Sequence, residues 1–213
     1  VLIVGAHRWT IDFAKRLVEL DIPVVLADSR WHSMRLAREA GLPTYYGEVL
    51  SEVFEHHLDT SSLGTLIATT DNDAYNTLVC TDFAPEFGRR AVFQTGMHGS
   101  PEDPKRHSQT LGGLPLFSEP MTTDDIREDF RHGAEIRQTR LTDEFGWDDF
   151  IDVQGCEPPV IALVRGAQLH MGPDMPKAKP RDILLYLGRN AQNSQKPDEN
   201  PKATSLAPEA QSK

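Results

Sequence analysis

Residues 1–30, VLIVGAHRWTIDFAKRLVELDIPVVLADSR, decide the fold. They predict a strand, a tight turn, a helix and a second strand that closes on an acidic residue. The first four residues are all apolar, as expected of a parallel strand covered on both faces. Apolar residues then recur at helical spacing, and Pro23 restarts the chain before the next apolar run. This order is typical of the opening unit of a dinucleotide-binding fold.

The turn after the first strand carries only part of the usual glycine fingerprint. Gly5, His7 and Thr10 stand at the three glycine positions of G-x-G-x-x-G. The first glycine allows the sharp turn, the second lets a pyrophosphate approach the main chain, and the third lets helix and strand pack closely. Because His7 puts a side chain at the second position, close binding of a dinucleotide is disfavoured. The free N–H groups at the helix start still suit an anion or a mononucleotide, and a scaffold that binds no nucleotide is an equal alternative.

An acidic residue closes the second predicted strand. Asp28 lies about 20 residues after Gly5, the separation at which such folds place an acid on a ribose diol. The sequence therefore retains the ribose position of the fingerprint more clearly than the pyrophosphate position.

Strands and helices continue to alternate as far as residue 95. Further strands are expected at 24–27, 43–46, 63–68 and 91–94. Between them, apolar residues recur at the spacing of a helix. The sequence thus predicts an α/β fold with a Rossmann-like, doubly wound parallel sheet. Ligands of such sheets lie at the carboxyl ends of the strands, so four loops should converge there: residues 5–8, 28–30, 47–48 and 69–73.

The composition and the residue periodicity change after residue 95. Residues 96–113 are rich in Gly, Pro and Ser and form a candidate linker, and Thr122 and Thr123 are positioned to cap a short helix. Predicted strands follow at 136–141, 159–164, 167–170 and 183–187. We therefore expect a Rossmann domain at 1–113, a small β-rich α+β domain at 114–189, and a disordered tail at 190–213, whose polar composition cannot bury a core.

Composition narrows the classes of partner. The net charge of −10 disfavours nucleic acid as the main partner. Two cysteines give no disulfide framework, and the adjacent His56 and His57 do not have the spacing of a helical metal pair, so no metal site is predicted. The chain starts with a buried-looking strand and no Met, so we expect it to be a piece of a longer polypeptide.

Several motifs together resemble a known family. VLIVGA at the start, Asp28, GLPTYYGE at 41–48 and TTDNDAYN at 69–76 are similar to the TrkA-N domain, also called the regulator-of-K-conductance (RCK) Rossmann domain. That domain lies on the cytoplasmic side of bacterial cation channels and transporters. A closer resemblance is to the C-terminal cytoplasmic region of bacterial sodium(potassium):proton antiporters. Glu48 replaces the family's usual Asp, and His7 and Thr10 are the larger departures.

The resemblance implies roles for particular positions. The phosphates of a bound nucleotide would face the first turn, the ribose would meet the second strand end, and the base and second phosphate would border the third and fourth. The first turn holds Gly5, Ala6, His7 and Arg8, and the end of the second strand holds Asp28, Ser29 and Arg30. The end of the third strand holds Glu48. The end of the fourth holds Thr69, Thr70, Asp71 and Asp73, with Asn76 fixing that loop. Helix capping alone is the alternative for Asp71, Asp73 and Asn76. The cofactor would be NAD(H) or an adenine nucleotide, and the absence of any cofactor stays open.

The expected function follows from the resemblance. The chain would be a regulatory module, not an enzyme, on the cytoplasmic face of the cell membrane. It would sense a nucleotide or mediate dimerisation for a monovalent cation:proton antiporter, with the transmembrane transporter domain preceding Val1 and a second copy of the chain as partners. Two alternatives remain: an NAD(P)-dependent oxidoreductase with a degenerate fingerprint, and a non-binding Rossmann scaffold.

Overall fold

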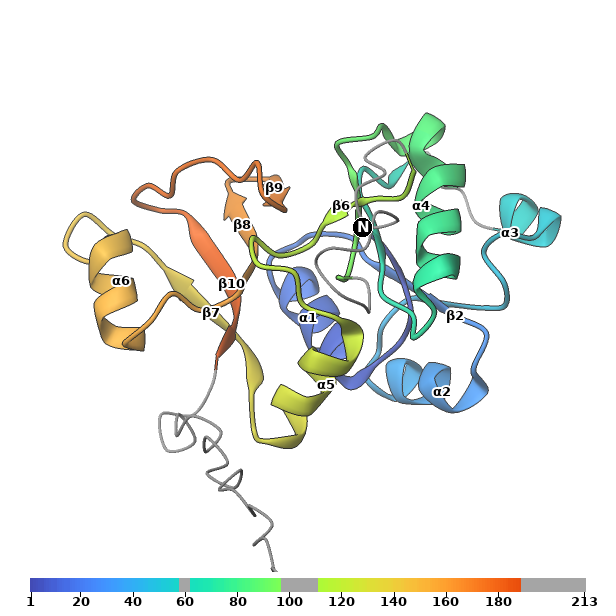
Figure 1. Cartoon of the computed structure of the whole chain (residues 1–213), viewed down its shortest axis with the longest axis horizontal. Coiled ribbons are helices and arrows are strands. Elements are labelled where there is room, and N and C mark those ends of the chain that lie inside the picture. The colour runs from blue at the N-terminus through green and yellow to red at the C-terminus, as the bar shows by residue number, and fades with distance from the viewer. Residues whose placement is uncertain (58–61, 97–110, 189–213) are drawn as a thin grey trace, which may run out of the picture.

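A computed structural model describes residues 1–57, 62–96 and 111–188 of the chain (Figure 1). Its first part is a six-stranded parallel sheet with the strand order β3-β2-β1-β4-β5-β6. The strands are β1 (Leu2–Val4), β2 (Val25–Asp28), β3 (Thr44–Tyr46), β4 (Leu66–Ala68), β5 (Val92–Gln94) and β6 (Leu114–Pro115). The order reverses between β1 and β4, which defines a Rossmann-type switch point.

Four helices cover the two faces of this sheet. They are α1 (Arg8–Glu19), α2 (Trp31–Glu39), α3 (Glu52–His57) and α4 (Asp73–Phe87). Ile3 of β1 packs in one apolar cluster with residues of α1 and α2, whereas its neighbours Leu2 and Val4 pack with α3 and α4. This alternation explains why β1 is apolar throughout, since both faces of the strand are buried.

The second part is a four-stranded antiparallel sheet with the order β7-β10-β8-β9. Helix α5 (Thr123–Arg131) precedes it and helix α6 (Trp147–Gln154) follows its first strand. A reciprocal cap starts α5, because Thr122 Oγ1 accepts from the Asp125 amide at 3.1 Å while the Asp125 carboxylate accepts from the Thr122 amide at 2.8 Å. The strands are β7 (Glu135–Arg140), β8 (Val160–Arg165), β9 (Gln168–Met171) and β10 (Ile183–Gly188).

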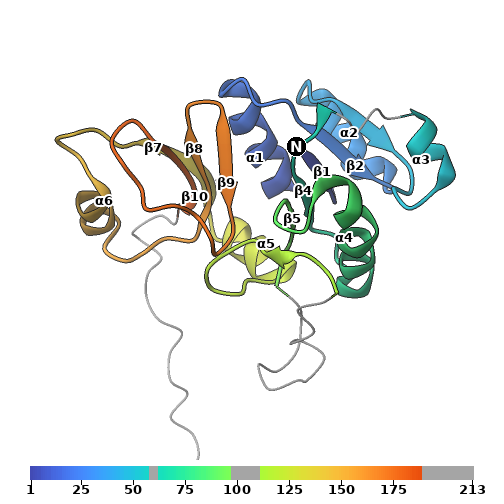
Figure 2. The same ribbon diagram turned by 90° about the horizontal axis from the view of Figure 1, so that it is seen from above.

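Helix α1 lies between the two sheets, as both views show (Figures 1 and 2). One apolar cluster includes Ile3 of β1, Phe13 and Leu17 of α1, and also Ile136 of β7 and Leu185 of β10. The antiparallel sheet therefore packs on the outer side of α1 and shares a core with the parallel sheet.

The fold class predicted from the sequence is confirmed: a Rossmann-like parallel sheet is followed by a small antiparallel sheet with helices. Two elements differ from expectation. Residues 147–154 form α6, and residues 114–115, predicted to start the second domain, pair with β5 as the sixth parallel strand. The domain boundaries stay a prediction. Residues 97–110 of the candidate linker at 96–113, and the tail at 190–213, lie outside the described residues.

Within the parts of the chain that the structure describes, every helix is too short or too polar to cross a bilayer.

Candidate functional site

The turn between β1 and α1 requires glycine at its first position. Gly5 has φ +110°, a value that L side chains rarely adopt. A Cβ there would lie 2.8 Å from Thr69 Oγ1 and 2.9 Å from the Thr70 backbone nitrogen. The end of β4 therefore presses directly against the turn, which brings the first and fourth loops together as the sheet topology predicts.

His7 closes this turn with its side chain. The ring is buried, and Nε2 lies 2.8 Å from the carbonyl oxygen of Thr69. Because a carbonyl only accepts, Nε2 carries the proton in this contact. Burial lowers the pKa of His7, outweighing the nearby Asp71 carboxylate that raises it. A neutral imidazole thus fills the position where a glycine would expose the main chain.

Thr10 ties the same turn from within α1. Its hydroxyl donates to the Gly5 carbonyl at 2.9 Å and accepts from the His7 amide at 2.8 Å. The side chain is fully buried. The second and third fingerprint positions therefore hold polar side chains: Thr10 bonds within the turn, and His7 bonds the end of β4.

Asp28 is a buried carboxylate at the end of β2. It accepts from the Ala6 amide at 2.7 Å and from the Arg30 amide at 2.7 Å. The Arg30 guanidinium adds contacts from Nη2 at 2.9 Å and Nε at 3.1 Å. Burial raises the pKa of Asp28, but the bonds from Arg30 and Ala6 together hold it below its ordinary value. The carboxylate is ionised and already bonded by the protein.

Arg30 also reaches across the strand ends to β4. Its Nη1 donates to Asp71 Oδ2 at 2.9 Å, and Arg127 Nη1 of α5 donates to Asp71 Oδ1 at 2.9 Å. The Asp28 carboxylate raises the pKa of Arg30, outweighing its partial burial. A chain of alternating charges thus runs over the carboxyl ends of β2 and β4.

The loop after β4 is held by Asn76. Its Oδ1 accepts from the Thr70 amide at 2.9 Å and its Nδ2 donates to the Thr70 carbonyl at 2.9 Å. The cap of α4 is Asn72, whose side chain accepts from the Tyr75 amide at 3.0 Å. Asp73 lies in the first turn of the helix. Capping therefore belongs to Asn72, which the sequence reading did not single out.

A cavity of about 280 Å³ opens at these strand ends. Tyr75 stands at its edge, and its hydroxyl donates to Glu48 Oε2 at 2.8 Å. Six of the predicted site residues line the cavity: Asp28, Ser29, Arg30, Glu48, Thr70 and Asp71. Seven others do not: Gly5, Ala6, His7, Arg8, Thr69, Asp73 and Asn76.

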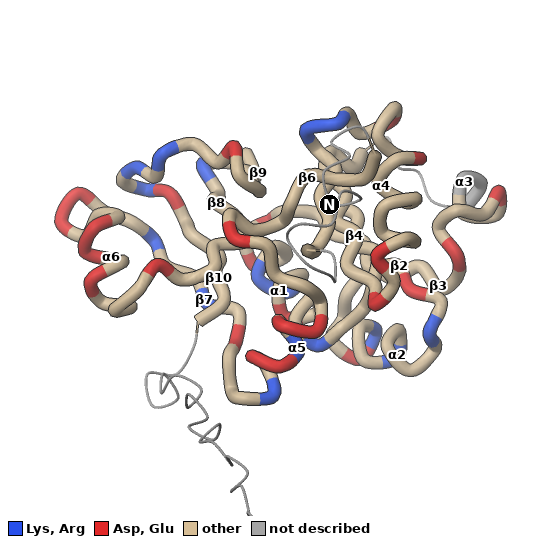
Figure 3. Tube along the Cα trace, in the orientation of Figure 1, with Lys and Arg blue, Asp and Glu red and all other residues tan. Residues whose placement is uncertain are grey.

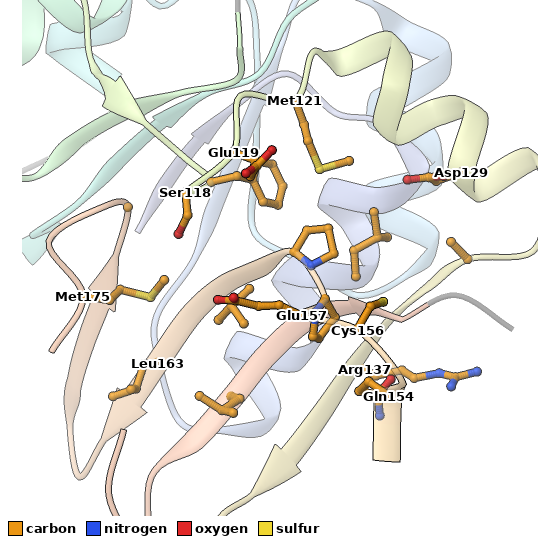
Figure 4. A pocket seen from close by; sticks show the side chains of 18 of the residues that line it. Ser118, Glu119, Met121, Asp129, Arg137, Gln154, Cys156, Glu157, Leu163 and Met175 are labelled. Carbon is orange, nitrogen blue, oxygen red and sulfur yellow. The ribbon is translucent and has the colours of Figure 1, made fainter. Parts of the chain in front are cut away.

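A larger hollow of about 1550 Å³ lies elsewhere, between the antiparallel sheet, α5 and α6. Figure 4 shows Met121 before α5, Cys156 and Glu157 after α6, and Leu163 and Met175 from the sheet side around it. None of the predicted site residues lines it. The smaller cavity is the one at the switch point, where ligands of this fold bind.

The sequence did not predict two features of the site. Arg127 comes from α5, and only the packing of that helix beside β4 brings it to Asp71. Tyr75 had a usable signal, since it lies in the first turn of the helix that follows β4. Figure 3 shows acidic and basic positions side by side on α5.

Within residues 1–57, 62–96 and 111–188, no three His, Cys, Asp or Glu residues gather as a metal site would need.

Comparisons with known proteins found one family model and a solved structure that are similar to this chain. Residues 1–91 match the model of the TrkA-N domain. A solved structure with a similar fold is the NAD(P)-binding domain of an exopolyphosphatase-related protein from Archaeoglobus fulgidus, with 15% identity and a TM-score of 0.43 over 61% of this chain and 93% of that chain. A search of curated proteins found no match. Residues 1–91 are therefore similar to TrkA-N domains.

Proposed function

We propose that this chain is a nucleotide-binding regulatory module of a monovalent cation:proton antiporter. One observation carries the binding part of the proposal: a cavity of about 280 Å³ at the switch point, with the ionised Asp28 carboxylate in its wall. Ligand cavities for small molecules range from about 300 to 1,000 Å³. At about 280 Å³ the cavity is close to the lower limit of that range, and it therefore suits a nucleoside better than an entire dinucleotide.

Asp28 supplies the chemistry for the ribose. An ionised carboxylate has about four acceptor positions, and here the Ala6 amide and Arg30 take them up. A ribose diol would replace the guanidinium contacts with two hydroxyl donors, while the two backbone amides keep the carboxylate oriented. Binding thus requires Arg30 to give up its contact with Asp28.

His7 favours a mononucleotide over a dinucleotide. Its ring is bonded to Thr69 and fills the approach to the turn that a pyrophosphate needs. A mononucleotide, which consists of a base, a ribose and a terminal phosphate, can bind without placing a phosphate beneath that ring. We therefore propose an adenine mononucleotide as the ligand, ahead of NAD(H).

The antiporter part rests on the family match and on the motifs GLPTYYGE and TTDNDAYN. A bound ligand biases a transporter only if it has different affinities for two arrangements of the module. In this proposal the transporter domain precedes Val1 and the module dimerises at the cytoplasmic membrane face. Sodium–proton exchange by the complete gene product in everted vesicles, with and without AMP, tests this part directly.

Calorimetric titration of the 213-residue chain tests nucleotide binding. We expect AMP to bind, and Asp28→Asn to weaken binding about tenfold, since a charged acceptor is lost. Glu39→Gln removes the same charge from an exposed position at the end of α2 and should leave the affinity unchanged. No heat with AMP, ADP, ATP, NAD or NADH would favour the non-binding scaffold, and turnover of NADH would favour the oxidoreductase.

A further inference from the structure

The Asp71 carboxylate occupies a position built for an anion. Each of its oxygens accepts from a different guanidinium: Oδ2 from Arg30 and Oδ1 from Arg127, both at 2.9 Å. His7 Nε2 lies 3.6 Å from Oδ1. The two guanidinium donors come from separate elements, the end of β2 and α5.

This anion is exchangeable. The side chains of Arg30, Asp71 and Arg127 are each 42–44% exposed, and ion pairs at such exposure contribute little net stability. Arginine forks bind phosphate oxygens as readily as carboxylate oxygens. A phosphate could therefore take the place of Asp71 without uncovering a buried charge.

We propose that Arg30 and Arg127 form the phosphate site of the bound mononucleotide, and that Asp71 fills this site until the phosphate displaces it. The inference rests on the proposed function and adds to it the group that the site recognises. Arg30 supports the assignment, because the same guanidinium contacts Asp28 at the ribose position and Asp71 at the phosphate position.

Through Arg127, the proposed phosphate site also involves the second part of the chain. It lies outside residues 1–91, on a helix that leads into the antiparallel sheet. The start of α5 is fixed to the parallel sheet, since Thr123 Oγ1 lies 3.0 Å from Thr95 Oγ1 and 3.3 Å from the Thr69 carbonyl. A phosphate bound by Arg127 therefore contacts the second part of the chain directly.

Calorimetry with adenosine and AMP on the 213-residue chain tests the phosphate site. We expect AMP to bind about tenfold more tightly than adenosine, the effect of a charge-assisted hydrogen bond. Arg127→Gln should reduce that difference severalfold, since Arg30 remains, and should leave adenosine binding unchanged. Arg131→Gln, an exposed position on the same helix, should preserve it.

Asp71→Asn provides the complementary test. Without the resident carboxylate, AMP should bind several-fold more tightly, whereas the affinity for adenosine should stay the same. Equal affinities of the unmodified chain for adenosine and AMP, or an Arg127→Gln variant that keeps the tenfold preference, would overturn the phosphate site alone. If neither ligand binds, the proposed function fails and this inference fails with it. A melting curve for each variant separates lost folding from lost binding.

Discussion

His7 Nε2 is hydrogen bonded to the carbonyl oxygen of Thr69 at 2.8 Å, so a side chain joins the ends of two neighbouring parallel strands. In the full glycine fingerprint this space is kept open for a pyrophosphate. The His7 side chain therefore occupies a position at this turn that the full fingerprint leaves to a glycine.

Replacing His7 with glycine should reopen the turn. We expect His7→Gly to bind NAD more tightly than the unmodified chain does, because the main chain becomes accessible to a pyrophosphate. The lost hydrogen bond should lower the unfolding free energy by about 0.5–1.5 kcal/mol. Titration with NAD, paired with a urea denaturation curve, measures both effects. A destabilised variant with no gain in NAD affinity would show that the ring is not the barrier.

The buried imidazole should also make stability depend on pH. Burial lowers the pKa of His7 in the folded chain below its ordinary value of 6.5. The unfolded chain therefore binds more protons as the pH falls through 6.5, and the folded state loses stability there. His7→Gln, which does not titrate, should lack this component. Denaturation curves at pH 7.5, 6.5 and 5.5 measure the difference, and parallel curves for both proteins would refute it.

Gly5 and Gly41 offer a matched pair of substitutions. Both have positive φ, but a Cβ on Gly5 would meet Thr69 and Thr70 below 3.0 Å, whereas a Cβ on Gly41 meets nothing within 4 Å. Gly41→Ala should cost about 1 kcal/mol from backbone strain alone. Gly5→Ala should cost at least about 2 kcal/mol, because steric overlap adds to that strain. Equal melting temperatures for the two variants would contradict this reading of the turn.

Asn76 should matter more than the helix cap next to it. Asn76→Ala removes both bonds to the Thr70 backbone at a buried position, and the groups left unsatisfied should cost about 2–3 kcal/mol. Asn72→Ala removes only an exposed cap, a loss of about 1 kcal/mol. Thermal unfolding ranks the two. Because Thr70 lines the cavity, we also expect weaker AMP binding by Asn76→Ala.

The sequence predicted the parallel sheet because each strand there is a short apolar run between helical stripes. It predicted the position of Asp28 because β1, α1 and β2 are consecutive and short. It could not predict that Arg30 and Arg127 meet on Asp71, since that contact depends on how α5 packs after the chain returns through β6. Helix α6 was missed because its acidic residues conceal a narrow apolar side centred on the buried Phe150.

The sandwiched position of α1 limits how this chain can be divided. Leu17 of α1 shares one core with Leu185 of β10, although most of the chain separates them in sequence. A protein cut after residue 95 would leave apolar surface of α1 facing water, and such surfaces associate with one another. The parallel sheet and α1 therefore share their core with β7 and β10, and a cut between the two sheets exposes that core.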